Sequence, residues 1–331
     1  MNKETPITLC REPAVFVGTE PQRLRHRLAT GDRVAVTGPM GGAETFREGI
    51  DYVVDAEGGT VRRTEGSRIP DWREHPHYGL DRFDHADVPY RSNGDFTCTV
   101  QYEAIISEAA ASGPAGSLEE ALPKLYRKLS AGLPVVYVVY GDSISAGHEA
   151  SAPELSYPER FAARLRSRFP GAEIAVRNAA LPGEGSGGGV RRIGEALALS
   201  PDLLTIAYGM NDQNRNPDGS NATPVDAFER NVAAMASTAR ELADAEVVFV
   251  TPCLPNPRWK YASERATDFA EAVRRVGASL GVPVADAQRA WIDELEAGKS
   301  HQSLLFNNLN HPNDYGHGLY AAALERLLLH A

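Results

Sequence analysis

The sequence predicts a three-layer α/β/α sandwich preceded by a small β-rich domain. After residue 134, apolar runs that do not alternate are each followed by a helical pattern, which is typical of parallel strands covered by helices on both faces. Before residue 102 the runs are short, rich in Val and Thr, and separated by Gly-Gly, Asp-Gly and Pro, a pattern typical of antiparallel strands. We therefore expect domains at residues 1–102 and 134–331, joined by a helical linker at 103–133.

The N-terminal region is predicted to form a β-sandwich or jelly-roll-like module, because its candidate strands follow one another at roughly ten-residue spacing. These strands are 14–18, 33–37, 51–55, 59–63 and 96–102. The stretch 71–90 is rich in His, Asp and Tyr. It can be interpreted as a metal site or as an aromatic loop that lines an active-site cleft, and we expect an ordinary polar loop.

The linker shows alanine-rich helical periodicity with leucines on one face. Residues 112–117 form its flexible point, and Ser117 followed by Glu120 is a capping-box pattern for a helix start. Pro123 either kinks that helix or moves its beginning.

The C-terminal region alternates strands and helices, and we expect a single sheet of five parallel strands. The predicted strands are 135–140, 174–178, 203–208, 247–251 and 282–285. The predicted helices are 157–169, 190–199, 224–243, 263–280 and 315–329.

Composition narrows the classes of partner. The chain has 331 residues, 42% of them hydrophobic, and a formal charge of -10, which argues against nucleic acid or anionic membrane as a partner. No signal-peptide pattern and no membrane-spanning apolar stretch is visible. Cys10, Cys98 and Cys253 are far apart and form no Cys-x-x-Cys pair, so we expect no disulfide, no zinc site and a cytoplasmic location. A homo-oligomer is compatible with the sequence.

The functional interpretation is built on one stretch of the sequence. It is the apolar run 135–139, followed by Gly141-Asp142-Ser143. It predicts a buried strand that delivers a serine to the C-terminal edge of the sheet, where open α/β folds bind their ligands. A serine nucleophile in acyl transfer needs a base, and it needs hydrogen-bond donors directed at the developing oxyanion.

Candidates for these roles follow other predicted strands. Gly183 can offer a backbone N–H in a tight turn, and Asn211 can offer a side-chain amide. His311, just before the last helix, is the candidate base. The glycine-rich stretch 183–189 lacks the Lys-Ser/Thr pair of a P-loop, so we do not expect nucleotide binding.

The order of these blocks from residue 134 onward resembles the SGNH, or GDSL, hydrolase family, whose domain is flavodoxin-like. The resemblance implies that Ser143 is the nucleophile and that His311 is the general base. It also implies that the N–H groups of Ser143 and Gly183 and the side chain of Asn211 form the oxyanion hole. Members of this family hydrolyse esters without a metal or an organic cofactor, and we expect the same here.

One position departs from the family pattern. The family places an aspartate three residues before the histidine, whereas this chain has Asn308, and no carboxylate lies between Ser300 and His311. Three interpretations remain open. In the first, Ser143 and His311 act as a dyad with Asn308 or a backbone carbonyl as the orienting group. In the second, Asp286 or Asp314 supplies the carboxylate. In the third, activity is weakened or lost.

The substrate is predicted from weaker signals. Trp259 and Tyr261 follow the fourth strand and can stack on a sugar ring or pack beneath their own loop. Family members with an N-terminal β-module often act on acylated carbohydrates. By this resemblance we expect the substrate to be an oligosaccharide or small-molecule ester from which an O-acetyl group is removed. The alternatives are a lysophospholipase or general short-chain esterase, and a non-catalytic carbohydrate-binding protein with a degenerate hydrolase domain.

Overall fold

The computed structural model describes residues 7–29, 33–39, 42–87, 92–106 and 117–328. The chain divides into two compact units. The first comprises Met1–Pro114 and Ile292–Leu309, and the second comprises Ala115–Trp291 and Asn310–Ala331. None of the helices among the described residues is both long and apolar enough to cross a membrane.

The second unit contains a five-stranded parallel sheet in the order β12-β11-β10-β8-β9. Its strands are β8 (Val135–Gly141), β9 (Ile174–Asn178), β10 (Leu203–Ala207), β11 (Glu246–Val250) and β12 (Val284–Ala285). Strand order reverses at β8, which lies between β9 and β10. This is the flavodoxin-like order, and its switch point is where such sheets bind ligands. The predicted fold class is confirmed.

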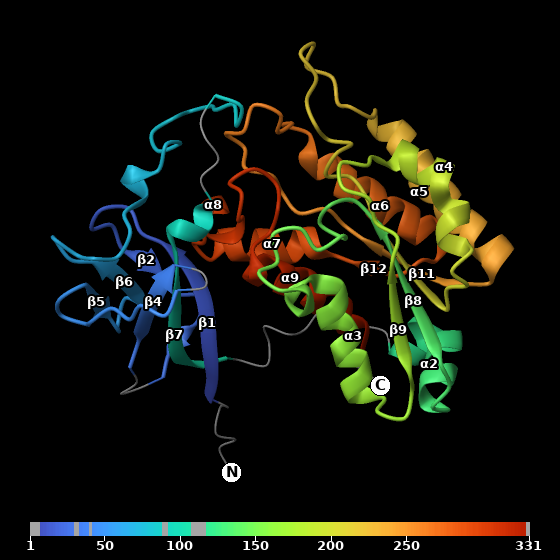
Figure 1. The fold of residues 1–331 in the computed structure, drawn as a ribbon, viewed down its shortest axis with the longest axis horizontal. Helices are drawn as coiled ribbons and strands as arrows, with labels where there is room; N and C mark the ends of the chain where they lie inside the picture. Colours follow the sequence, from blue (N-terminus) through green and yellow to red (C-terminus); the bar gives the residue numbers. More distant parts are fainter. Residues whose placement is uncertain (1–6, 30–32, 40–41, 88–91, 107–116, 329–331) are drawn as a thin grey trace. The chain divides into compact units, whose positions relative to one another are not determined.

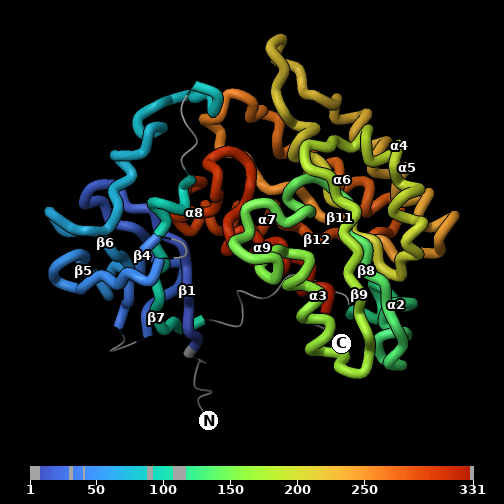
Figure 2. The backbone as a smooth tube through the Cα atoms, viewed as in Figure 1, coloured from blue at the N-terminus to red at the C-terminus, as the bar shows by residue number. Residues whose placement is uncertain are grey.

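Helices cover both faces of this sheet (Figure 1). The helices on one face are α4 (Ser186–Leu197), α5 (Val225–Ala243) and α6 (Ala266–Leu280), and those on the other are α3 (Tyr157–Arg168) and α9 (Asp314–Glu325). The tube in Figure 2 follows the chain from each strand through the helix that connects it to the next strand. Successive side chains of β8 point to opposite faces of the sheet, so they pack into the core on both sides. Tyr140 packs in the core beneath α4 and α5, while Tyr137 packs edge-on against Phe161 of α3.

Two short helices replace the single predicted linker helix. They are α1 (Leu118–Ala121) and α2 (Pro123–Ser130). Ser117 and Glu120 form the capping box of α1, and Pro123 occupies the first turn of α2, where its missing N–H costs no hydrogen bond. Most of the predicted flexible point, residues 112–116, lies outside the described residues.

The first unit is antiparallel and β-rich, as predicted. One of its sheets contains β1 (Ile7–Val15), β7 (Thr97–Ile105), β3 (Arg27–Leu28) and β4 (Ala35–Pro39), and the other contains β2 (Gln22–Arg23), β6 (Thr60–Arg63) and β5 (Tyr52–Asp55). The pair of β1 and β7 is the longest, with Ile7 opposite Ile105 and Val15 opposite Thr97. Short 3-10 helices lie at Trp72–Glu74 and Asn93–Asp95, and in the second unit at Pro153–Leu155 and Arg326–Leu328.

A segment near the C-terminus belongs to the first unit, which the predicted boundaries did not anticipate. The chain passes from the second unit to the first within α7 (Ala287–Glu296), and α8 (His301–Leu304) follows. Buried Lys299 forms an ion pair of 2.9 Å with buried Glu12 of β1. The side-chain amide of Asn93 donates to the carbonyls of Gln302 and Leu305 at 3.0 and 2.9 Å. These contacts make residues 292–309 part of the N-terminal unit.

Candidate active site

The turn after β8 holds Ser143 in a fixed position. Asp142 accepts a hydrogen bond from the Ile144 N–H at 3.0 Å, and the N–H of His148 donates to the Ser143 carbonyl at 3.0 Å. A side chain at Gly141 would collide with the carbonyl of Ala207 on β10, so only glycine fits where the strand ends. Ser143 is 5% exposed.

Asp142 supports the turn that carries Ser143 by accepting the hydrogen bond from the Ile144 N–H. Burial, together with the charge of the nearby Asp212, raises the pKa of this carboxyl to about 7, although backbone N–H groups act in the opposite direction. The backbone hydrogen bonds that Asp142 accepts therefore give it a structural role in this turn.

The structure brings Ser143 and His311 together. Ser143 Oγ lies 2.9 Å from His311 Nε2, within the range for proton transfer. His311 precedes α9, whose first turn is capped by the Asn313 side chain accepting from the Gly316 N–H at 3.0 Å. The helix cap fixes the backbone on which the histidine is carried.

The loop after β9 approaches the same edge. The Leu181 N–H donates to the Gly141 carbonyl at 3.0 Å, which continues the pairing of β9 with β8 beyond Asn178. The Asn178 side chain donates to the Ser145 carbonyl at 2.9 Å. Gly183 follows with φ of +77°, a conformation that favours glycine. These contacts hold the Gly183 loop beside the nucleophile turn.

Asn211, after β10, is linked to that loop. Its side-chain amide donates to the Glu184 carbonyl at 3.0 Å, which fixes the plane of the amide and leaves its second hydrogen for another acceptor. The Glu184 carboxylate is held by Arg192 and by the Tyr208 hydroxyl, the latter at 2.8 Å. Burial opposes ionisation of Glu184, but these hydrogen bonds keep its pKa below the usual value.

Asp212 has a structural role. Its carboxylate accepts from the N–H and the hydroxyl of Ser186 at 2.9 and 2.6 Å, and so it caps α4 from a different loop. This cap explains why α4 begins at Ser186 rather than at the predicted residue 190. Burial raises the pKa of Asp212, against the hydrogen bonds that it accepts.

The carboxylates that the sequence suggested for orienting His311 are occupied elsewhere. Asp286 forms an ion pair of 2.8 Å with Arg274 and accepts from the Thr251 hydroxyl at 3.2 Å. Asp314 accepts from the N–H and the hydroxyl of Ser151 at 2.8 and 2.6 Å.

Asn308 forms hydrogen bonds with two residues of the first unit. Its amide nitrogen lies 3.0 Å from His77 Nδ1, and its oxygen accepts from the Asn93 amide at 3.4 Å. Asn308 is 1% exposed and has φ of +59°. Its predicted role as the residue that orients His311 stays a prediction.

The sequence analysis missed one acidic group beside the base. Glu149 Oε1 lies 3.8 Å from His311 Nδ1, on the imidazole nitrogen that does not face Ser143. Glu149 lies six residues after the nucleophile in a stretch without helical or strand periodicity. The only sequence signal for Glu149 was that it lies in the segment directly after Ser143, at the C-terminal edge of the sheet.

Trp259 and Tyr261 lie in the loop after β11. Trp259 is 5% exposed and Tyr261 is half-buried, with their rings 5.5 Å apart in an edge-to-face arrangement. The Lys260 ammonium lies 4.8 Å from the centre of the Tyr261 ring. Of the two predicted substrate contacts, Tyr261 offers more accessible surface.

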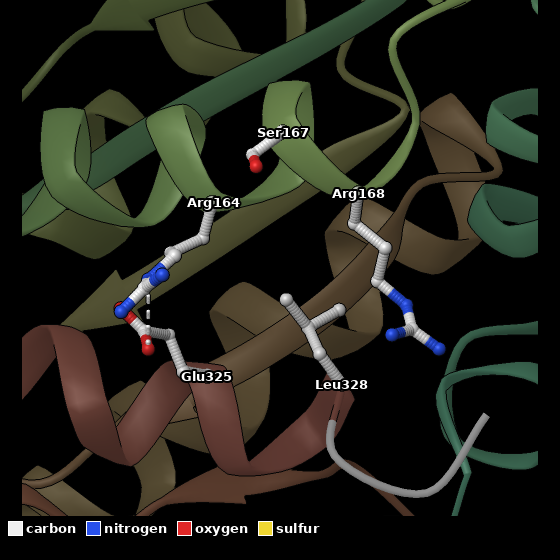
Figure 3. A pocket seen from close by; sticks show the side chains of 5 residues that line it. All are labelled: Arg164, Ser167, Arg168, Glu325 and Leu328. Carbon is white, nitrogen blue, oxygen red and sulfur yellow. Dashed lines mark ion pairs between the residues drawn. The ribbon is translucent and has the colours of Figure 1, made fainter.

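Among the residues that the structure describes, no group of three His, Cys, Asp or Glu side chains is placed to hold a metal ion. A surface hollow is lined by Arg164, Ser167 and Arg168 of α3 together with Glu325 and Leu328 (Figure 3). It lies at the end of α3 remote from Tyr157, whose hydroxyl contacts Ser145 at 2.7 Å, so it is separate from the Ser143 edge.

Part of the chain is similar to proteins of a known family. A profile described as the GDSL-like lipase/acylhydrolase family matches residues 139–319. No curated protein sequence matches the chain. Among solved structures, a two-domain esterase active on acetylated mannans is 20% identical with a TM-score of 0.54, covering 68% of this chain and 57% of its own.

A second solved structure resembles the chain over a smaller part. An acetylxylan esterase from Geobacillus stearothermophilus is 20% identical with a TM-score of 0.51, covering 60% of this chain and 95% of its own. At these identities the likeness shows the fold. The chain spans 57% of the length of the mannan-active esterase, so that protein's substrates are not transferred with the fold.

Proposed function

This chain belongs to the GDSL-like lipase/acylhydrolase family, and we propose that it is a carboxylic ester hydrolase that removes short acyl groups, chiefly acetyl, from an esterified carbohydrate. The observation that carries the proposal is the 2.9 Å contact between Ser143 Oγ and His311 Nε2 at the switch point of the sheet. The carbohydrate part of the proposal is supported by the substrates named for the two similar structures, acetylated mannans and acetylxylan.

The reaction follows from the placement of these groups. His311 Nε2 takes the proton of Ser143 as Oγ bonds to the acyl carbon, and the carbonyl oxygen becomes an oxyanion. The N–H groups of Ser143 and Gly183 and the amide of Asn211 are the proposed donors to that oxygen. The C–O bond to the alcohol then breaks, and His311 gives the proton to the leaving oxygen.

The second half of the reaction releases the acid. Water attacks the acyl carbon of the Ser143 ester while His311 removes a proton from the water. The bond to Oγ breaks, the proton returns to Ser143, and the carboxylic acid leaves. Every proton in both halves is moved by His311, and each step uses groups of this chain.

The first experiment is hydrolysis of p-nitrophenyl acetate, with EDTA present, by the wild type, Ser143→Ala and Ser167→Ala. Ser167 is an exposed serine of α3 in the hollow of Figure 3, so it controls for the substitution itself. We expect Ser143→Ala to lower kcat by on the order of 10³-fold or more and Ser167→Ala to match the wild type. Equal rates for all three folded proteins would refute the serine esterase.

A second experiment tests the substrate class. Acetate release from acetylated xylo- and manno-oligosaccharides is compared with hydrolysis of p-nitrophenyl acetate, butyrate and octanoate. A higher kcat/KM on the acetylated sugars, with rates that fall as the acyl chain lengthens, is expected for a carbohydrate deacetylase. Rates that rise with acyl length would instead indicate the lysophospholipase or general esterase alternative. Sugar binding without turnover would indicate the binding-protein alternative.

A further inference from the structure

The carboxylate of Glu149 and the hydroxyl of Ser143 lie at opposite nitrogens of the same imidazole. Glu149 Oε1 is 3.8 Å from His311 Nδ1, and Ser143 Oγ is 2.9 Å from Nε2. The Glu149 side chain is 26% exposed and the His311 side chain is 16% exposed. The pair is therefore only partly accessible to water, and charge on one group affects the other more strongly than it would at the surface.

The backbone at Glu149 is unusual. Its φ of +67° lies in the left-handed region, which a residue with a Cβ rarely adopts and which is disfavoured for a glutamate. Such conformations persist where the surrounding structure enforces them, and they concentrate at functional sites.

Two contacts from α9 hold the loop that contains Glu149. The Nε2–H of His317 donates to the His148 carbonyl at 3.0 Å, and the Asp314 carboxylate accepts from Ser151 N–H and Oγ. His148 and Ser151 lie on either side of Glu149 in the sequence. Because α9 begins three residues after His311, the same helix positions the base and the loop with the carboxylate.

We propose that Glu149 is the positioning residue for His311, the role that an aspartate three residues before the histidine has elsewhere in the family. Its carboxylate accepts the Nδ1–H of His311 and so selects the tautomer whose Nε2 lone pair faces Ser143. It also stabilises the imidazolium that forms when Nε2 takes the serine proton. In this role Glu149 transfers no proton.

This inference deepens the proposed function and rests on it. A separation of 3.8 Å is longer than a hydrogen bond, and catalytic hydrogen bonds commonly shorten when substrate binds. The glutamate side chain has three rotatable bonds, so a change of rotamer can shorten this distance without moving the backbone. The ring of His148 also lies near the base, with its centre 5.6 Å from that of His311.

The test compares Glu149→Gln, Glu149→Asp and the control Glu154→Gln with the wild type on p-nitrophenyl acetate across pH. Glu154 is an exposed glutamate five residues further on, and it undergoes the same loss of charge. We expect Glu149→Gln to lower kcat by about 10²-fold with KM changed by less than about twofold. We expect the acidic limb of its pH–rate profile to move to lower pH, because the imidazolium loses its anionic neighbour.

The remaining variants distinguish a role of Glu149 in positioning His311 from a purely structural role. Glu149→Asp keeps the charge at a greater distance, so it should lose less activity than Glu149→Gln and keep the acidic limb in place. Glu154→Gln should match the wild type in rate and pH profile. Melting temperatures, measured alongside, establish that each variant is folded.

Two outcomes would overturn the inference while leaving the esterase proposal intact. One is a Glu149→Gln rate within about twofold of the wild type while Ser143→Ala is inactive. The other is equal loss in the Gln and Asp variants with an unmoved acidic limb, which would indicate a packing role. If Ser143→Ala is as active as the wild type, the proposed function fails first.

Discussion

Asn308 and Glu149 are both non-glycine residues in the left-handed region, with φ of +59° and +67°, and they lie in different units of the chain. Asn308 occupies the position where the family pattern has its aspartate, yet its amide bonds to His77 and Asn93. Glu149 occupies no family position, yet its carboxylate lies beside His311. Spacing in the sequence identified the first residue, and only the fold identifies the second.

The two residues also differ in the conformational energy that a positive φ costs them. Asparagine tolerates the left-handed region because its short amide bonds locally, whereas glutamate has no such compensation. Conformational strain retained at Glu149 is therefore more informative about function than the same φ at Asn308. The predictions below test that contrast.

The largest expected effect is that of Glu149→Gly. Glycine adopts this φ without strain, so the free energy of unfolding should stay constant or rise by up to about 1 kcal/mol. Loss of the carboxylate should nevertheless lower kcat by about 10²-fold, or about 2.7 kcal/mol in activation free energy. Calorimetry and p-nitrophenyl acetate kinetics measure the two quantities on one sample. A variant that is both less stable and less active would contradict the assignment of strain to function.

The strands and the catalytic blocks could be predicted because their signals are local. The apolar run that ends at Gly141-Asp142-Ser143 and the glycine at 183 depend on the backbone of a few neighbouring residues. Pairing of parallel strands then brings their C-terminal ends to one edge, whatever the loops between them contain.

The remainder depends on contacts between residues that are distant in the sequence. Helix α4 begins at Ser186 because Asp212 caps it from another loop, and Lys299 joins the first unit through Glu12. The direction of the Glu149 side chain depends on a backbone held by α9, more than 160 residues later. Periodicity and spacing do not contain these contacts.

The next effect concerns the histidine that holds the loop of Glu149. Burial lowers the pKa of His317 to about 4, against the hydrogen bond to the His148 carbonyl, which raises it. The neutral ring accepts from the Tyr157 N–H and donates to the His148 carbonyl. The unfolded chain therefore binds a proton at pH values where the folded chain does not. The contribution of neutral His317 to the free energy of unfolding is present above about pH 6.5 and is lost as pH falls toward 4.

His317→Gln should remove that dependence, because an amide can make both bonds and does not titrate in this range. Between pH 6.5 and pH 4.5 the wild type should lose about 2 kcal/mol more than the variant. Asp142 contributes with the opposite sign, since burial raises its pKa to about 7. It is common to both proteins, so it cancels in the difference. The free energy of unfolding is measured with urea at several pH values for both proteins. An equal change with pH in the wild type and the variant would contradict the role given to His317.

The smallest expected effect is that of Asn308→Asp, which installs the family's carboxylate. An aspartate cannot donate to His77 Nδ1 as the amide does, so the variant should be destabilised by about 1 kcal/mol at neutral pH. Burial lowers the pKa of His77, and His85 lowers it further, so protonation of His77 compensates for the lost donor only in acid. Thermal melts at two pH values measure this. A gain in kcat of about tenfold or more would instead show that the base lacked the aspartate, and that Glu149 does not replace it.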